Sequence, residues 1–124
     1  MATGATLATD HEVGRRYLDA CNASVQLARY IRGLGYRARA HHLRNSCVIL
    51  VPVAADGGLG EMGRNGFLVS RKFGTNFRLA CVTTDMPLAF DPPARLGMED
   101  FCSKCMKCAD NCPSEAISTK TPEM

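Results

Sequence analysis

Apolar side chains recur mostly at steps of three and four residues from Asp10 onward, as they do along one face of an α-helix. Gly35 follows the last of them, and glycine commonly ends a helix. The pattern predicts a long amphipathic helix built on Val13, Tyr17, Ala20, Val25, Leu27, Ala28, Ile31 and Leu34.

Three later segments have the composition of β-strands. The stretch "YRARAH" (36 to 41) alternates apolar and basic residues, which is typical of a strand with one solvated face. The apolar run "CVILVPV" (47 to 53) predicts a buried strand, with Pro52 at an edge, a bulge or the strand end. Two further strands are expected in "FLVS" (67 to 70) and "FRLACVTT" (77 to 84). His41 and His42 point to opposite faces of a strand and are interpreted as a solvated basic edge.

Residues 54 to 66, "AADGGLGEMGRNG", hold five glycines in thirteen positions. Such a segment predicts a turn-rich loop, with one short helix around Glu61 to Arg64. Because glycine allows close backbone approach, a bulky ligand could lie against the loop, although an irregular surface connection fits equally well. The Pro-rich stretch 85 to 97 that follows the last strand is interpreted as a linker. The predicted fold class is α/β (α+β), with a boundary near residue 97.

Size and charge exclude several classes of protein. A chain of 124 residues with 46% hydrophobic residues suits one modest globular domain. No apolar run approaches the roughly 20 residues of a transmembrane helix. The net charge of +3 is mild and mostly scattered, so no nucleic-acid partner is expected. No export signal is recognised, and seven cysteines, an odd number, favour a reducing compartment, so a cytoplasmic location is expected.

Four cysteines at the spacing C-x2-C-x2-C-x3-C, followed by proline, give "FCSKCMKCADNCPSEAI" (101 to 117) its chemistry. This is the cysteine run of bacterial ferredoxins, in which closely spaced thiolates hold an iron-sulfur cluster. Cys102, Cys105 and Cys108 are the expected ligands of one 4Fe-4S cluster, with Cys112 as a fourth candidate. A zinc site is the alternative, but four-cysteine zinc sites usually separate two C-x2-C pairs by a longer loop.

The fourth ligand stays open at this point. A two-cluster module needs a second cysteine run, and the sequence contains one only. Either Cys112 or a distant thiol completes the cluster, or the chain is a piece of a longer protein. The distant cysteines, Cys21, Cys47 and Cys81, are interpreted as buried, inert thiols.

Two blocks of the sequence, "GLGEMGRNGFLVSRKFGTNFRLACVTTDMPLAFDPP" and "GMEDFCSKCMKCADNCPSEAI", resemble the reductive dehalogenases. The upstream stretch "LARYIRGLGYRARAHH" extends the resemblance, which covers roughly residues 13 to 118. Epoxyqueuosine reductase resembles the chain in the glycine loop and in a "TDxPL" element. That family typically has Trp and Lys where this chain has Glu61 and Arg64, so the dehalogenases are the closer match.

The resemblance implies a nitroreductase-like domain portion that binds cobalamin base-off, here residues 1 to 97. A partial ferredoxin-like segment, here residues 98 to 124, would then pass electrons from 4Fe-4S clusters to the corrinoid. The implied substrate is an organohalide, whose halogen is replaced by a proton, and the implied partner is an external electron donor of ferredoxin or flavodoxin type. The family members are several times longer than this chain.

The resemblance also implies site residues. Arg78 falls at the family's active-site arginine, Tyr17 at its proton-donating tyrosine, and Asn45 at a polar position near the substrate. A guanidinium beside a phenol favours the phenolate and so eases proton donation. The structural alternatives are a core tyrosine at Tyr17, an ion pair of Arg78 with an acidic residue such as Asp85 or Glu61, and a turn at Asn45.

In the glycine loop, the resemblance makes Gly58, Gly60, Glu61 and Arg64 the candidates for holding the loop against the corrin. Two classes of function therefore follow from the sequence. One is the catalytic core of a corrinoid reductive dehalogenase, and the other is a small iron-sulfur protein that transfers electrons without catalysis.

Overall fold

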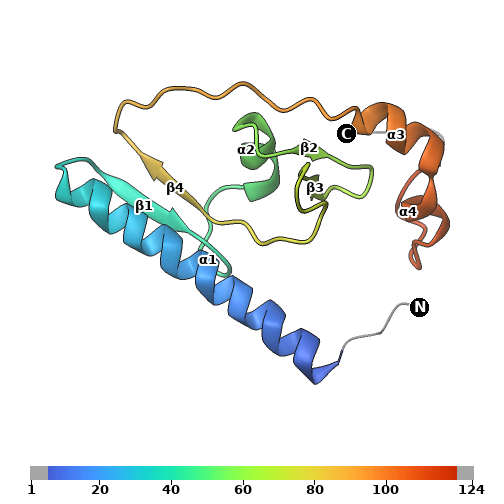
Figure 1. Ribbon diagram of the computed structural model, residues 1–124, viewed down its shortest axis with the longest axis horizontal. Helices are drawn as coiled ribbons and strands as arrows, with labels where there is room; N and C mark the ends of the chain where they lie inside the picture. The colour runs from blue at the N-terminus through green and yellow to red at the C-terminus, as the bar shows by residue number, and fades with distance from the viewer. Residues whose placement is uncertain (1–5, 120–124) are drawn as a thin grey trace. The chain divides into compact units, whose positions relative to one another are not determined.

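The computed structural model describes residues 6–119, which fold into two compact units. The first unit contains the chain up to Leu50 together with Phe77–Leu88, and the second contains Val51–Asn76 and the chain from Ala89 onward. Figure 1 shows the elements along the chain, coloured from the N-terminus to the C-terminus. These units do not divide the chain at residue 97. The boundary expected there separates a cobalamin-binding segment from an iron-sulfur segment, and it stays a prediction.

The first unit is built on α1, Leu7–Gly33, which confirms the predicted long helix. Its N-cap is Thr6, whose hydroxyl accepts a hydrogen bond from the Thr9 amide at 3.2 Å. The buried face consists of Ser24, Ala28 and Ile31. Two of these side chains are small, so the helix can approach its neighbours closely.

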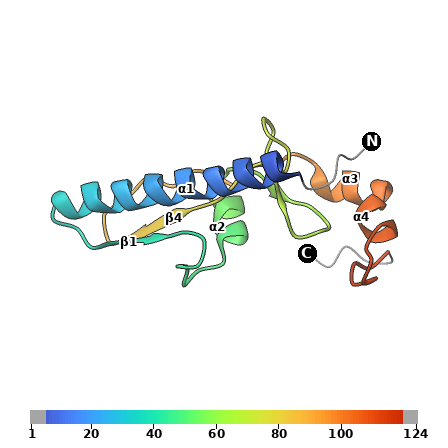
Figure 2. The same cartoon turned by 90° about the horizontal axis from the view of Figure 1, so that it is seen from below.

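Strands β1, Ala38–His41, and β4, Cys81–Thr84, form an antiparallel pair in which Ala40 lies opposite Val82. Helix α1 packs on both strands and covers one face of this small sheet (Figure 2). The predicted strands are confirmed, although both are shorter than the sequence pattern suggested. Side-chain alternation holds along β1, where Arg39 is exposed between two partly buried alanines.

His41 corrects the expectation of a solvated basic edge. Its side chain is only 2% exposed. The Cys47 amide donates to its Nδ1 at 3.2 Å, and its Nε2 lies 2.9 Å from the Thr83 hydroxyl. Because Nδ1 accepts from an amide, Nε2 carries the hydrogen and donates a hydrogen bond to the Thr83 hydroxyl oxygen. The imidazole therefore ties the chain after β1 to strand β4.

The predicted buried strand at 47 to 53 is wrong, because Leu50–Asp56 forms helix α2 instead. Pro52 falls in its first turn, where an amide would have no partner within the helix, so proline is tolerated there. Cys47 precedes the helix and is exposed, which also corrects its interpretation as a buried thiol. Periodicity alone cannot distinguish a short apolar run in a strand from one in a helix.

The second unit also holds a small hairpin of β2, Glu61–Met62, and β3, Leu68–Val69. The short helix expected around residues 61 to 64 is therefore wrong, and the loop pairs as strands. Gly60 explains how the strands approach so closely: a Cβ atom there would collide with the Val69 carbonyl oxygen. Leu68 is 2% exposed and forms part of the core of this unit.

Residues 85–97 contain neither helix nor strand, as the linker prediction requires, and they lead into α3, Met98–Cys105. The short helix α4, Lys107–Asp110, follows directly. Within residues 6–119 no helix has the length and apolar character needed to cross a bilayer.

We expect Gly60→Ala to lower the free energy of unfolding by about 1–3 kcal/mol, the usual cost of forcing extra atoms into a packed site. Urea unfolding followed by circular dichroism measures the change. Gly14→Ala is the control, because a Cβ atom on this helical glycine meets nothing within 4 Å. The free energy of unfolding of that variant should rise by about 0.5–1 kcal/mol, because alanine reduces the backbone freedom of the unfolded chain. Equal stability of the Gly60→Ala and wild-type proteins would contradict the packing.

Candidate functional site

Three cysteines line one cavity of about 310 Å³ in the second unit. Cys102 and Cys105 lie on α3, three residues apart, and therefore on the same face of the helix. Met106 adopts a left-handed conformation with φ of 51°, which ends α3 before α4 begins at Lys107. This break returns the chain so that Cys108, on α4, borders the same cavity. The three ligands expected from the spacing are thus brought together.

Cys112 lies in the turn after α4 and is not among the described residues that line this cavity. Its sulfur is 3.4 Å from the Ser114 hydroxyl. The hydrogen bond with that hydroxyl, together with the amides of Ser114, Ala116 and Ile117, lowers the pKa of Cys112 to about 7. This thiolate is stabilised by its own turn, and in two-cluster ferredoxins the fourth cysteine of such a run binds the other cluster.

The cavity is bordered by thiols, which are ligands of both zinc ions and iron-sulfur clusters. In the part of the chain that the structure describes, no three His, Cys, Asp or Glu side chains converge on one point as metal ligands. A zinc ion would require its thiolates within about 2.3 Å. A cluster distributes its ligands over several iron atoms, so three cysteines around one cavity fit a 4Fe-4S group.

Glu61, at the start of β2, contacts the beginning of the cysteine helix. Its carboxylate accepts a hydrogen bond of 2.6 Å from the amide of Leu96, just before α3. That bond, and weaker ones from the amides of Met98, Gly97 and Glu99, lower the pKa of Glu61 below its usual value. Gly97, the N-cap residue, has no side chain to cap the helix, and the Glu61 carboxylate lies at this end, where the helix dipole is positive.

Arg64 contacts the same helix one turn further along. Its Nε donates to the Cys102 carbonyl at 3.2 Å, and its Nη1 donates to the Ser118 carbonyl at 2.7 Å. Arg64 also borders the cysteine cavity. The sequence proposed Glu61 and Arg64 as corrin-binding residues. Those roles stay predictions, and the contacts described here direct both side chains to the cysteine segment.

Gly58 has a packing role in the second unit. Its φ is +76°, and a Cβ atom would lie 2.6 Å from the Pro92 carbonyl oxygen. The glycine loop therefore approaches the linker backbone as closely as it approaches β3 at Gly60. Both glycines are needed for backbone packing, and their predicted contact with a corrin stays a prediction.

Tyr17 and Arg78, which the sequence singled out together, are in contact within the first unit. The Arg78 guanidinium carbon lies 4.8 Å from the centroid of the Tyr17 ring, which is a cation–π geometry. Tyr17 lines a cavity of about 640 Å³ that His42 and Leu43 also border. Arg78 lines a second cavity, of about 280 Å³. Each residue of the pair therefore lines a different cavity of the first unit.

Of the structural alternatives for Arg78, the ion pair with Asp85 in the same unit does not form. Asp85 instead binds Arg37, whose Nε donates to its carboxylate at 2.8 Å, and this hydrogen bond lowers the pKa of Asp85. Glu61 is engaged by the start of α3. The Nε atom of Arg78 is buried and has no hydrogen-bond partner among residues 6–119. A buried donor without a partner costs about 1–3 kcal/mol of stability. A bound ligand that accepts a hydrogen bond from Arg78 Nε would remove this cost.

Asn45 is exposed and lies in a tight turn, where its backbone pairs with that of His42. It is not part of the Tyr17–Arg78 contact, although its turn borders the cavity that Tyr17 lines. Three groups in the sites described here were not recognised as important from the sequence. They are the buried His41, the Ser114 hydroxyl beside Cys112, and the Arg37–Asp85 pair. Only Ser114 had a signal, since it follows the proline of the cysteine run.

Comparisons with known proteins identify the class of the cysteine segment first. Residues 98–118 match the family model of the 4Fe-4S binding domain. The chain is also 42% identical over 116 residues to the tetrachloroethene reductive dehalogenase of Desulfitobacterium hafniense, which covers 94% of this chain and 21% of that protein. An epoxyqueuosine reductase of Leadbetterella byssophila is 42% identical over only 65 residues, covering 52% of this chain and 20% of that protein.

A solved structure of a reductive dehalogenase, described as B12-dependent, superposes with a TM-score of 0.78 at 36% identity. The match covers 89% of this chain and 16% of that one. Nearly the whole chain thus matches one segment of reductive dehalogenases, and the predicted mixture of helices and strands followed by a ferredoxin-type segment is confirmed. It spans about one fifth of the length of the curated relatives it matches.

We expect iodoacetamide to alkylate Cys112 in the metal-free chain with a half-maximal rate near pH 7, because only the thiolate reacts and the pKa is about 7. Mass spectrometry of peptides measures the rate at each pH. Ser114→Ala removes the largest stabilising contact and should move the midpoint to higher pH. An unchanged midpoint in this variant would show that the hydroxyl does not stabilise the thiolate.

Proposed function

We propose that this chain forms the proton-donor and first-cluster part of a corrinoid reductive dehalogenase. The observation that carries the proposal is the Tyr17–Arg78 contact, with a buried, unpartnered Arg78 nitrogen beside it. The cysteine cavity supports it, as does the similarity to dehalogenases over 94% of the chain. The fuller activity needs polypeptide beyond this segment, because the relatives are about five times longer.

The reaction replaces the halogen of an organohalide by hydrogen, and it consumes two electrons and one proton and releases halide. Cobalamin, when bound, would supply the reducing centre for the carbon–halogen bond. The Tyr17 hydroxyl would supply the proton to carbon. Arg78, stacked on the ring, holds the phenol in place.

The cysteine segment would provide the electrons. Cys102, Cys105 and Cys108 would hold a 4Fe-4S cluster at the cavity they line, and Cys112 would serve a second cluster or complete the first. The electrons come from an external donor of ferredoxin or flavodoxin type. Exposed apolar side chains on α1, such as Leu18 at 65% and Leu27 at 51%, are surfaces that further polypeptide would cover.

A non-catalytic iron-sulfur carrier is the second candidate, favoured by the fact that the cysteine cavity lies entirely within the second unit. Such a carrier has no need of the Tyr17–Arg78 contact. An epoxyqueuosine reductase is less well supported, since that similarity covers only about half of the chain.

Anaerobic reconstitution of the chain with iron and sulfide should produce the broad visible absorption of an iron-sulfur cluster. Cys102→Ser should lose most of this absorption, because serine replaces a thiolate ligand. Cys47→Ser should retain it, since Cys47 is exposed and lies in the first unit. Equal iron content in the Cys102→Ser and wild-type chains would exclude Cys102 as a ligand.

Catalysis is tested by placing this segment into the Desulfitobacterium hafniense relative in place of its homologous residues. We expect halide release by the chimera, and a loss of about 10²–10⁴-fold in kcat for Tyr17→Phe, the usual contribution of a general acid. Tyr30→Phe is the matched control, because Tyr30 lies on the same helix and is 66% exposed. A similar effect of the two substitutions would remove Tyr17 from the role of proton donor.

A further inference from the structure

The glycine loop and the cysteine helix are joined by two residues of opposite charge, which we call the loop–helix bracket: Glu61 and Arg64. They stand three positions apart at the β2 end of the loop, and both belong to the same compact unit as α3. Neither contact is required by the hairpin itself, whose strands pair through their own backbones.

The charges of the bracket match the polarity of the helix. Glu61 accepts from the Leu96 amide at 2.6 Å, at the end of α3 where the helix dipole is positive. Arg64 donates to the carbonyl of Cys102 at 3.2 Å, so it contacts the backbone of a cluster ligand directly. Its second bond, to the Ser118 carbonyl, ties the segment after the cysteine run to the same guanidinium.

The position of Arg64 has an electrostatic consequence. Among residues 6–119, Arg64 and Lys107 are the two basic residues that line the cysteine cavity. Thiolates and reduced iron-sulfur clusters are negatively charged, and the reduced cluster carries one more negative charge than the oxidised one. A guanidinium held beside the cavity therefore stabilises the reduced state more, since Coulomb attraction grows with the charge.

We propose that Glu61 and Arg64 are positioning residues for the cluster and that Arg64 also raises its reduction potential. Glu61 orders the start of α3, and Arg64 fixes the turn that bears Cys102. The family resemblance links the glycine loop to the corrin. Through Glu61 and Arg64 the same loop thereby sets the position and the reduction potential of the 4Fe-4S cluster. This inference rests on the proposed 4Fe-4S cluster of Cys102, Cys105 and Cys108.

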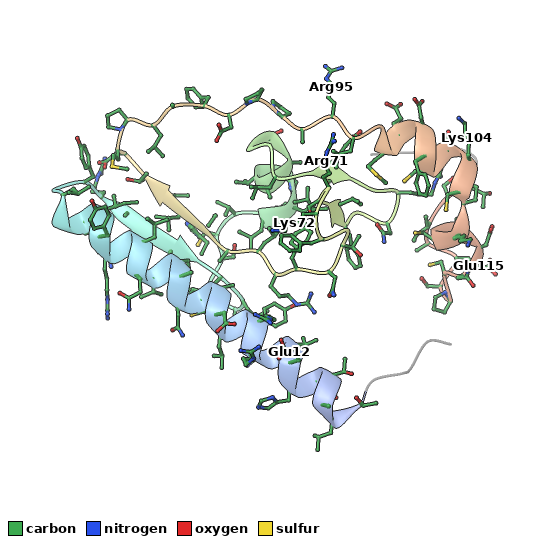
Figure 3. The ribbon with its side chains drawn as sticks, in the orientation of Figure 1. Glu12, Arg71, Lys72, Arg95, Lys104 and Glu115 are labelled. Carbon is green, nitrogen blue, oxygen red and sulfur yellow. The ribbon has the colours of Figure 1, made fainter. Side chains whose placement is uncertain are left out.

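The potential of the reconstituted full chain, followed by EPR during redox titration, tests the charge. For Arg64→Gln we expect the reduced-to-oxidised ratio at a given potential to fall about tenfold, which is about 59 mV for a one-electron couple. Arg64→Lys keeps the charge and should restore most of the wild-type potential. Arg71→Gln, at an exposed arginine of the same unit labelled in Figure 3, should leave it unchanged. An identical potential for the Arg64→Gln and wild-type chains overturns the electrostatic role.

Hydrogen exchange in the metal-free chain tests the positioning role without any cluster. Glu61→Gln should increase exchange at residues 96–99, because a neutral amide accepts more weakly from these amides than a carboxylate does. Glu115→Gln is the control, since Glu115, labelled in Figure 3, is an exposed glutamate of the same unit that lies outside residues 96–99. Equal exchange in the Glu61→Gln and wild-type chains overturns the positioning role of Glu61.

The two experiments separate this inference from the proposed function. If the wild-type chain takes up no cluster, the proposed cluster and the role of Arg64 in its potential both fail. The exchange result still decides whether Glu61 orders the helix. If the cluster forms and neither Arg64→Gln nor Glu61→Gln has an effect, the bracket fails while the proposed cluster stands.

Discussion

The hydrogen bond from the Leu96 amide to the Glu61 carboxylate is the contact on which the cysteine segment of the second unit depends. The linker before α3 has no helix or strand of its own, and the N-cap glycine has no side chain. Glu61 supplies an acceptor for the Leu96 amide directly before this N-cap. Because Glu61 follows Gly60, whose missing side chain lets β2 lie against β3, the hairpin and the helix are ordered together.

The first unit depends on a different constraint, the register of two short strands beneath a long helix. The pairing of β1 with β4 is secured at its ends by the Arg37–Asp85 pair and by the buried imidazole of His41. Arg78 lies three residues before β4, and this register holds it against Tyr17 on α1. Two residues that are 61 positions apart in the sequence thus form one contact because the sheet determines where β4 begins.

Under the proposed function, the two units would supply two requirements of reductive dehalogenation, a proton and electrons. The phenol and guanidinium belong to the first unit, and the cysteine cavity belongs to the second. The glycine loop has a structural role in both of its close contacts, at Gly58 and at Gly60. The family resemblance makes Gly58 and Gly60 candidates for contact with a corrin. Close backbone packing also explains why glycine stands at both positions, and that explanation requires no cofactor.

Local patterns by themselves determined the long helix, the alternation along β1, the unstructured linker and the grouping of three cysteines around one cavity, because helical periodicity, strand alternation and cysteine spacing are properties of neighbouring residues. The same reasoning predicted a strand where α2 forms and a helix where β2 forms. The secondary structure of a short apolar or glycine-rich segment depends on its tertiary contacts, which local patterns do not reveal. Only the tertiary structure decided that His41 is buried, that Glu61 accepts from the Leu96 amide and that Arg64 contacts Cys102. Those contacts join residues far apart in the chain, and no local preference of either partner encodes them.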